Sequence, residues 1–473
     1  TEHTLLNAGF NLLGTSLAAQ EYWDNHRALD YLLTRKDIDP ERIGVYGSSG
    51  GGTQTAYYIG LDPRVKVAAI CSFFSTRERT MELQGPSDGC QHIPYEGREQ
   101  LEVPDFALMM APRPLLILSG KYDFVDLWGA QQGFAELQQC YKVLGVPEKV
   151  DMLTVETGHG LGAEKRQKLA SWFKRWLKDN QSPVKKAAQD RFQLSDMLCT
   201  TKGQVNVSMP GALSIMQENV NQLDEWASKR ETFLSKGKKT VQTKMLDLLG
   251  LKGLPDHKIR IEATGHDSMR EYEQYKFQLI REGEMPVPCI LIMPSRANAD
   301  SPIELRLQEE GKGTYLSEYA NFAAALTEGK ILLLADLRGL GETTDPAFYT
   351  DAKYWNREYR NAMISMHIGR PIMGQRVVDI LTLLDFCSEH ELLKGHPVKV
   401  FANGIYGPAV IHAAYLDERI NSVEITHSVK TWKEYIEKPM QWDMYSNVLY
   451  GALKYYDLPD LIRLSNCPIC FAD

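Results

Sequence analysis

Alternating helical and extended patterns dominate residues 14–178. Helical periodicity over 16–34 gives way to an apolar run at 42–47, and the alternation continues to a final helix at 163–178. Such alternation is typical of a mainly parallel sheet whose crossover helices cover both of its faces. The sequence therefore predicts an α/β fold with strands near residues 42–47, 65–72, 114–119 and 149–155.

A later stretch of the chain repeats part of this pattern. A shift of 355 residues without a gap matches identical residues from position 14 to position 70. Because one constant offset over that length is hard to obtain by chance, we interpret the chain as two copies of one domain. The matched pairs are Gly14 and Gly369, Gln20 and Gln375, Asp24 and Asp379, Leu29 and Leu384, Asp30 and Asp385, Val45 and Val400, Gly52 and Gly407, Asp62 and Asp417, Arg64 and Arg419, and Ile70 and Ile425.

The repeat sets the domain organisation that we expect. A first domain covers residues 1–180, a linker of Pro, Ser and charged residues covers 181–195, and a second domain covers 196–473. The segment that begins the second copy has no matching segment ahead of the first copy. The segment that ends the first copy has no matching segment after the second copy. We therefore expect a fragment of a longer protein, in which the first domain lacks its N-terminal half and the second its C-terminal end.

A glycine-rich bend follows the predicted strand at 42–47. Residues 47–51 read G-S-S-G-G, which places Ser49 at the centre of a G-x-S-x-G motif. A strand that turns at once into a helix strains its central residue, and side chains at the flanking positions would collide across the bend. We expect Ser49 to be a nucleophile above the sheet, with the amide of Gly50 facing a developing oxyanion. A turn with idle serines is the alternative.

A serine nucleophile needs a histidine base and a carboxylate that orients the base, and both follow along the chain. Asp123 comes just after the apolar strand at 114–119, and His159 lies in a glycine-flanked loop after the strand at 149–155. The order serine, acid, histidine is that of hydrolases with this motif. Asp126 is a rival acid, and Asp123 is preferred because it lies closer to the strand end.

Three further side chains are candidates for substrate contact: His92, Tyr95 and Trp128. His92 lies in an irregular insertion that could cover the pocket. The two aromatic rings could stack on a sugar, although buried packing is the favoured interpretation. No metal site is predicted, because the C-x-x-C of Cys467 and Cys470 lacks a second pair or a nearby histidine and lies in what reads as a buried strand. The dispersed cysteines predict free thiols.

These motifs resemble the α/β-hydrolase superfamily. More narrowly, RALDYLLTRKDIDPERIGVYGSSGGG, APRPLLILSGKYD and ETGHG are similar to acetyl xylan esterases and dienelactone-hydrolase-like carbohydrate esterases of bacteria that degrade plant polysaccharides. The resemblance covers residues 14–178 and, more weakly, 287–425. It implies Ser49 as nucleophile, His159 as base, Asp123 as acid, and ester hydrolysis without a metal or organic cofactor. It also implies a second oxyanion donor upstream of the first residue.

The second copy departs from the pattern at the bend. Gly404 stands where Ser49 stands in the first copy, and no other serine takes its place. Residues 332–346 resemble the strand and loop that precede the nucleophile in this family, which implies that the fold persists. We therefore expect two α/β-hydrolase domains in tandem, with mainly parallel sheets flanked by helices. The second would be a degenerate pseudo-hydrolase used for stability, dimerisation or glycan binding.

The expected function is that of a serine esterase that removes acetyl groups from a plant polysaccharide such as xylan. A serine peptidase of the prolyl oligopeptidase kind and a non-catalytic scaffold are the alternatives, and the resemblance implies a periplasmic or secreted protein. A net charge of -8 and scattered Lys and Arg residues argue against nucleic acid as a partner. The sequence has no run of 18 apolar residues, so it predicts no membrane span. The sequence does not determine the oligomeric state and is compatible with a homo-oligomer.

Overall fold

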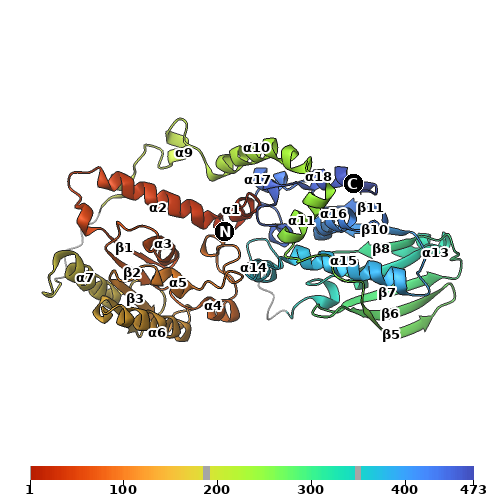
Figure 1. Ribbon diagram of the computed structural model, residues 1–473, viewed down its shortest axis with the longest axis horizontal. Coiled ribbons are helices and arrows are strands. Elements are labelled where there is room, and N and C mark those ends of the chain that lie inside the picture. Colours follow the sequence, from red (N-terminus) through yellow and green to blue (C-terminus); the bar gives the residue numbers. More distant parts are fainter. Residues whose placement is uncertain (1, 185–191, 347–352, 473) are drawn as a thin grey trace. The chain divides into compact units, whose positions relative to one another are not determined.

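The computed structural model describes residues 2–184, 192–346 and 353–472 (Figure 1). Part of the predicted linker, residues 185–191, lies outside the described residues. No helix within the described ranges is long and apolar enough to cross a membrane.

The chain divides into two compact units. The first consists of Thr1–Asn7 and Ser16–Ile215, and the second of Ala8–Thr15 and Met216–Asp473. This division assigns residues 8–15 to the second unit and extends the first unit to residue 215, whereas the sequence placed the boundary at 181–195.

The first unit is built on a four-stranded sheet in which neighbouring strands run parallel. Two of its strands are buried along their whole length, which explains why they appear in the sequence as continuous apolar runs. The strands lie in chain order across the sheet, as β1 (Gly44–Ser48), β2 (Val67–Cys71), β3 (Leu115–Gly120) and β4 (Val150–Val155). The four predicted strands are confirmed to within two residues at each end.

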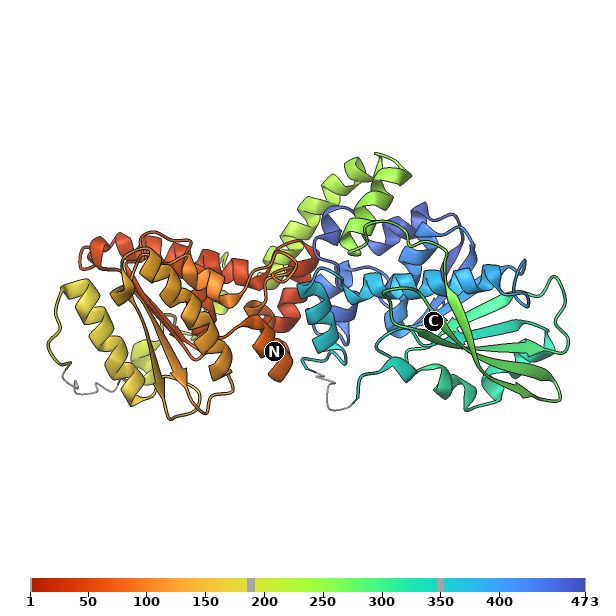
Figure 2. The same ribbon diagram turned by 60° about the horizontal axis from the view of Figure 1, so that its bottom comes forward.

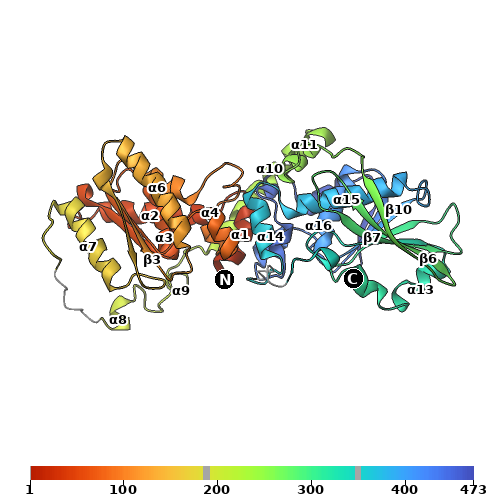
Figure 3. The same cartoon turned by 90° about the horizontal axis from the view of Figure 1, so that it is seen from below.

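Helices cover both faces of this sheet, as predicted. On one face, Val67 and Leu116 pack against Leu169 and Trp172 of α7 (Ala163–Lys178). The opposite face packs against α2 (Leu17–Leu33), α3 (Gly50–Ile59), α5 (Val103–Leu108) and α6 (Leu127–Val143). Figure 3 shows α3 and α6 across the sheet from α7. Trp172 is 4% exposed, so α7 contributes this ring to the core.

A long connection leaves the sheet between β2 and β3. It holds α4 (Arg77–Leu83), the short turn η2 (Gly89–Gln91) and α5 (Val103–Leu108). A buried ion pair fixes it, since an Arg77 guanidinium nitrogen lies 3.0 Å from a carboxylate oxygen of Glu96 and donates to the hydroxyl of Tyr57 in α3 at 3.0 Å. The insertion that the sequence marks as irregular is therefore ordered by charges inside it.

The second unit carries an eight-stranded mixed sheet with the strands in the order β12-β11-β10-β8-β9-β7-β6-β5. Figure 2 shows this unit in green to blue. The pairs among β8 to β12 are parallel, and those that join β5, β6, β7 and β9 are antiparallel. The bounds are β5 (Arg260–Ser268), β6 (Tyr272–Ile280), β7 (Val287–Pro294), β8 (Ile303–Leu307), β9 (Ile331–Ala335), β10 (Val398–Asn403), β11 (Ile420–Thr426) and β12 (Ile469–Ala472).

Strand β6 mixes charged and apolar side chains in its residues YEQYKFQLI, as antiparallel strands with a solvated face do. One prediction for this unit needs correction. The buried strand predicted at the C-x-x-C is β12, and the prediction of its burial was wrong. It lies at an edge of the sheet, where Cys470 is exposed. All eight cysteines are free, as predicted.

The helices of the second unit follow the order of the first. The shift of 355 residues that relates the two copies in sequence carries α2 onto α15, β1 onto β10, α3 onto α16 and β2 onto β11 within about two residues. The two helices are α15 (Ile372–Glu389) and α16 (Gly407–Leu416). The two-copy organisation stays a prediction, and this correspondence supports it.

The same ion pairs brace both units. In the first, Arg64 bridges Asp30 at the end of α2, at 2.6 Å, and Asp62 in the turn after α3, at 2.6 Å. In the second, Arg419 bridges Asp385 of α15 at 2.8 Å and Asp417 at 2.6 Å. Each arginine thus ties the helix before the bend to the turn that leads into the next strand.

Removal of either arginine is expected to destabilise the unit that contains it. Arg64→Met removes the arginine from the buried Asp62 carboxylate, which keeps His26 beside it, and Arg419→Met removes the arginine from Asp417, while Asp385 keeps its pair with Arg281. The expected cost of each is about 1–3 kcal/mol in the free energy of unfolding. Urea denaturation followed by pulse proteolysis measures this cost for each unit. Arg27→Met, which removes a surface pair with Asp30 and a contact with the exposed ring of Trp23, is the control. Equal behaviour of Arg64→Met and Arg27→Met would contradict the bracing role.

Candidate active site

The bend between β1 and α3 holds Ser49 in a strained backbone conformation. Its φ is 59° and its ψ is −122°, in a region that residues with a side chain rarely adopt. Two hydrogen bonds hold this geometry: the Ser49 N–H donates to the carbonyl of Cys71 at 3.0 Å, and the Thr53 N–H donates to the carbonyl of Ser49 at 3.0 Å. The predicted strain at the motif's central serine is confirmed.

The glycines of the bend are not equally constrained. A Cβ at Gly47 would overlap the Gly51 carbonyl oxygen, and a Cβ at Gly52 would lie 2.8 Å from the Cys71 carbonyl oxygen. A Cβ at Gly50 or Gly51 would meet open space. The expectation that both positions flanking the serine must be glycine is therefore correct for Gly47 and wrong for Gly51, because the second close approach falls one residue later.

A histidine and a carboxylate meet at the ends of the next two strands. His159 Nδ1 lies 2.8 Å from Asp123 Oδ1, and the Val125 N–H donates to the same oxygen at 3.1 Å. The Asp123 side chain is 1% exposed. Burial acts to raise the pKa of Asp123, but the hydrogen bonds from His159 and Val125 outweigh it and hold this pKa below its usual value. The carboxylate is thus ionised at neutral pH and orients the imidazole.

An aromatic ring stacks on this imidazole. The ring of Phe124 lies parallel to that of His159 at a centroid distance of 4.3 Å. Phe124 is itself 62% exposed, so it shields one face of the base while its other surface faces solvent.

Asp126, the alternative candidate for the acid, has a different structural role. Its carboxylate caps α6 by accepting the Gly129 N–H at 2.7 Å, and it lies 3.4 Å from the guanidinium of Arg79. The acid that contacts His159 is Asp123.

Two residues that sequence analysis did not single out hold the histidine loop. Ser72, directly after β2, accepts hydrogen bonds from the Gly160 N–H at 3.1 Å and from Lys165 Nζ at 3.1 Å. Lys165 is fully buried and also donates to the Gly160 carbonyl at 2.9 Å. Because Cys71, the residue before Ser72, accepts the Ser49 N–H, the serine bend and the histidine loop are anchored to adjacent residues at the carboxyl end of β2.

The three candidates for substrate contact occupy different environments. His92 is 4% exposed, and its Nε2 accepts the Ser87 N–H at 2.9 Å within the insertion. Tyr95 has a positive φ of 71° and carries the guanidinium of Arg98 over its ring at 4.0 Å. Trp128 is 53% exposed, so the favoured interpretation of buried packing is wrong for this residue. No contact between these three and the Asp123–His159 pair appears among the hydrogen bonds and ring contacts of the described residues.

The equivalent bend of the second unit is filled by a carboxylate. Gly404 has a φ of 64°, and a Cβ there would overlap the side chain of Glu309. Glu309 accepts the Ile405 N–H at 3.0 Å and lies 3.1 Å from the guanidinium of Arg357. A serine at this bend would need the space that Glu309 occupies. The cavity at this edge of the sheet measures about 320 Å³ and is lined in part by Glu309, His427, Tyr435 and Trp442.

Comparison with known proteins finds a family model that matches the part of the chain that holds the first of these sites. Residues 13–180 match the model of the prolyl oligopeptidase family, Peptidase_S9. The candidate hydrolase YtaP of Bacillus subtilis (strain 168) is 26% identical over 168 residues, which are 35% of this chain and 56% of that protein. The chain thus spans about half the length of the curated relative that it matches.

Solved structures of carbohydrate esterases are also similar. A candidate acetyl xylan esterase of Bacteroides fragilis is 14% identical with a TM-score of 0.43, covering 50% of this chain and 67% of that chain. Acetyl xylan esterase 1 of Thermoanaerobacterium is 15% identical with a TM-score of 0.36, covering 50% and 77%. Methylesterase BT1017 is 27% identical with a TM-score of 0.27, covering 35% and 38%.

Alanine substitutions at Gly47 and Gly51, the two glycines of the motif, should show which of them the packing of the bend requires. Gly47→Ala forces its Cβ into the Gly51 carbonyl and is expected to lower the free energy of unfolding of the first unit by at least about 2 kcal/mol. Gly51→Ala enters open space on α3 and is expected to be neutral or to stabilise by up to about 1 kcal/mol. Urea denaturation measures both. Similar losses for the two variants would show that the bend is not packed as described.

Proposed function

We propose that residues 13–180 form an α/β-hydrolase domain and that this domain is a serine hydrolase with Ser49 as its nucleophile. His159 is the general base, and Asp123 orients it. The observation that carries the proposal is the strained backbone of Ser49, anchored at the end of β2 beside the loop that holds His159. A strained serine at a strand-to-helix bend is the geometry in which a hydroxyl stands clear of its own backbone for attack.

The proposed reaction is acyl transfer in two halves. Ser49 Oγ attacks the carbonyl carbon as His159 takes the hydroxyl proton, and the tetrahedral oxyanion accepts a hydrogen bond from the Gly50 N–H at the start of α3. The C–O bond to the leaving alcohol breaks, and His159 returns the proton to that alcohol. Water then attacks the acyl-enzyme through the same groups and releases the acid. No step draws on a metal or an organic cofactor.

We propose a carbohydrate ester as substrate, with acetyl as the acyl group. The three motifs that carry Ser49, Asp123 and His159 resemble those of carbohydrate esterases. The exposed rings of Phe124, beside His159, and of Trp128 offer apolar surface of the kind on which sugar rings stack. Since a polysaccharide is met outside the cytoplasm, we also propose export to the periplasm or the cell exterior.

A serine peptidase of the prolyl oligopeptidase kind is the second candidate. It is favoured by the match of residues 13–180 to that family's model. The same three residues would serve, and the difference would lie in an amine leaving group that His159 must protonate.

We propose that the second unit is a degenerate copy without hydrolase activity. Three observations support this: its elements follow the same order as those of the first unit, Arg419 forms the matching bridge, and the Glu309 carboxylate fills the bend at Gly404. The fold depends on the helices and the bridge, whereas attack on a carbonyl depends on one open position above the sheet.

Substrate assays on the full chain test the proposed activity. The intact protein is expected to hydrolyse p-nitrophenyl acetate and to release acetate from acetylated xylan, with little cleavage of peptide p-nitroanilides. Ser49→Ala should reduce kcat for the esters by at least about 10³-fold. Ser48→Ala, at the end of β1, is the matched control and should stay within a few-fold of the intact protein. Equal ester hydrolysis by Ser49→Ala would refute the nucleophile, and faster anilide cleavage would favour the peptidase.

A pair of asparagine variants should identify the acid. Asp123→Asn is expected to lower kcat by about 10³–10⁴-fold, because an amide cannot fix the tautomer of His159. Asp126→Asn keeps an oxygen that can cap α6 and should change kcat by less than about threefold. Because the pKa of Asp123 lies below its usual value, protonation of this carboxylate cannot cause an activity loss near neutral pH. Kinetics across neutral pH check both points, and a larger effect of Asp126→Asn would reverse the assignment.

A further inference from the structure

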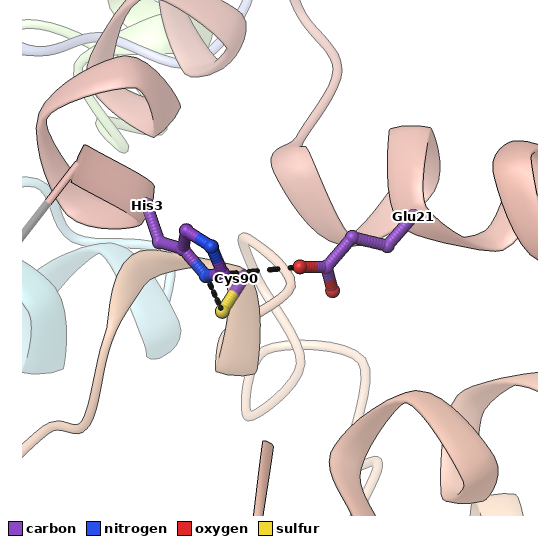
Figure 4. A group of neighbouring side chains, drawn as sticks. All are labelled: His3, Glu21 and Cys90. Atoms are coloured by element: carbon purple, nitrogen blue, oxygen red, sulfur yellow. Dashed lines mark hydrogen bonds and ion pairs between the residues drawn. The ribbon is translucent and has the colours of Figure 1, made fainter. Parts of the chain in front are cut away.

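Three side chains with metal-binding atoms meet in the first unit, outside the residues of the proposed active site. His3 comes from α1 (Glu2–Leu12), Glu21 from α2 and Cys90 from η2, and Figure 4 shows the imidazole, the carboxylate and the thiol turned toward one another. His3 Nδ1 lies 3.1 Å from Cys90 Sγ and 3.7 Å from Glu21 Oε1. All three ligand atoms lie within 4.8 Å of one another.

These spacings are close to those around a bound zinc ion. With bonds of about 2.0–2.3 Å in tetrahedral geometry, neighbouring ligand atoms lie roughly 3.3–3.6 Å apart. A shorter distance from His3 Nδ1 to Glu21 Oε1 and a slightly longer distance from His3 Nδ1 to Cys90 Sγ would place the three atoms at three of the four corners of a tetrahedron around the ion. Imidazole nitrogen, thiolate sulfur and carboxylate oxygen are each zinc ligands.

The surroundings of the three atoms are already ordered. Cys90 is 4% exposed, and Glu21 has 16% of its side chain exposed. The neighbouring Gly89 N–H donates to Thr4 Oγ1 at 3.0 Å, so η2 is seated on α1 by a contact that does not involve the cluster. His3 has 46% of its side chain exposed, which leaves room for water at a fourth position.

We propose that His3, Glu21 and Cys90 form a binding site for Zn²⁺ or a similar divalent transition metal, with water as the fourth ligand. On binding, His3 coordinates through Nδ1 and keeps its proton on Nε2. The Cys90 thiol gives its proton to solvent as the metal–sulfur bond forms, so that binding releases one proton. Neither the esterase reaction nor its residues are needed for this inference.

The site would link parts of the first unit that are far apart in sequence. Cys90 belongs to the same connection as Arg77 and Glu96, whose buried pair contacts Tyr57 of α3. A metal on Cys90 would join this connection to α1 and α2, and thereby restrain the segment between β2 and β3. The chemical role that we assign to the ion is structural.

Cobalt absorption on the full chain tests the site directly. Cys467 and Cys470 could bind metal by themselves, so the background is the Cys467→Ser/Cys470→Ser protein, stripped with a chelator. One equivalent of Co²⁺ is expected to give a thiolate-to-cobalt charge-transfer band in the near ultraviolet, and Zn²⁺ should displace it. Cys90→Ser should lose the band and bind Zn²⁺ at least about 100-fold more weakly. Cys140→Ser on α6 is the matched control and should keep both.

A second variant keeps the test decisive if Cys90→Ser folds poorly. His3→Ala removes a half-exposed side chain at the start of α1 and should weaken Zn²⁺ binding by at least about 100-fold while its far-ultraviolet circular dichroism is unchanged. The proposal is overturned if the background protein gives no charge-transfer band, or if the band and the affinity survive in Cys90→Ser or in His3→Ala.

Discussion

The carboxyl end of β2 fixes the geometry on which the candidate active site depends. The Cys71 carbonyl accepts the amide of Ser49 and so holds a backbone conformation that is unfavourable by itself, and Ser72 accepts the amide of Gly160 beside His159. Strain of this kind persists only where the surroundings over-determine it. Here the surroundings are a parallel sheet with two fully buried central strands, so a shift of β2 in its register would misplace the serine and the histidine together.

We proposed above that the second unit is a degenerate copy of the first, and its bend illustrates the reason. It keeps the strand, bend and helix order and the arginine bridge of the first unit, yet Glu309 lies where a nucleophile would have to stand. Stability in such a fold is spread over helices and ion pairs, whereas attack by a serine needs one unobstructed site. Loss of the reaction with retention of the architecture therefore needs few changes, which is how we interpret the relation between the two units.

Sequence was informative where one local pattern determines the structure. Buried parallel strands are continuous apolar runs, and the serine, acid and histidine follow strand ends, so their positions could be predicted. Lys165 could not, because a lysine in an amphipathic helix reads as a solvent-facing residue, and its burial against Ser72 depends on tertiary packing. Glu309 and the His3 cluster were missed for the same reason, since each brings together segments that lie far apart in the chain.

We propose that Ser49, alone among the serines of this chain, is an activated nucleophile. Labelling of the intact protein with a fluorophosphonate, followed by peptide mapping by mass spectrometry, tests it most directly, since the reagent forms a stable adduct only with an activated serine. The account predicts a single adduct on the peptide that contains residues 44–52, located at Ser49, and no adduct on any peptide of the second unit. An adduct at another serine, or an unlabelled protein that is folded, would contradict it.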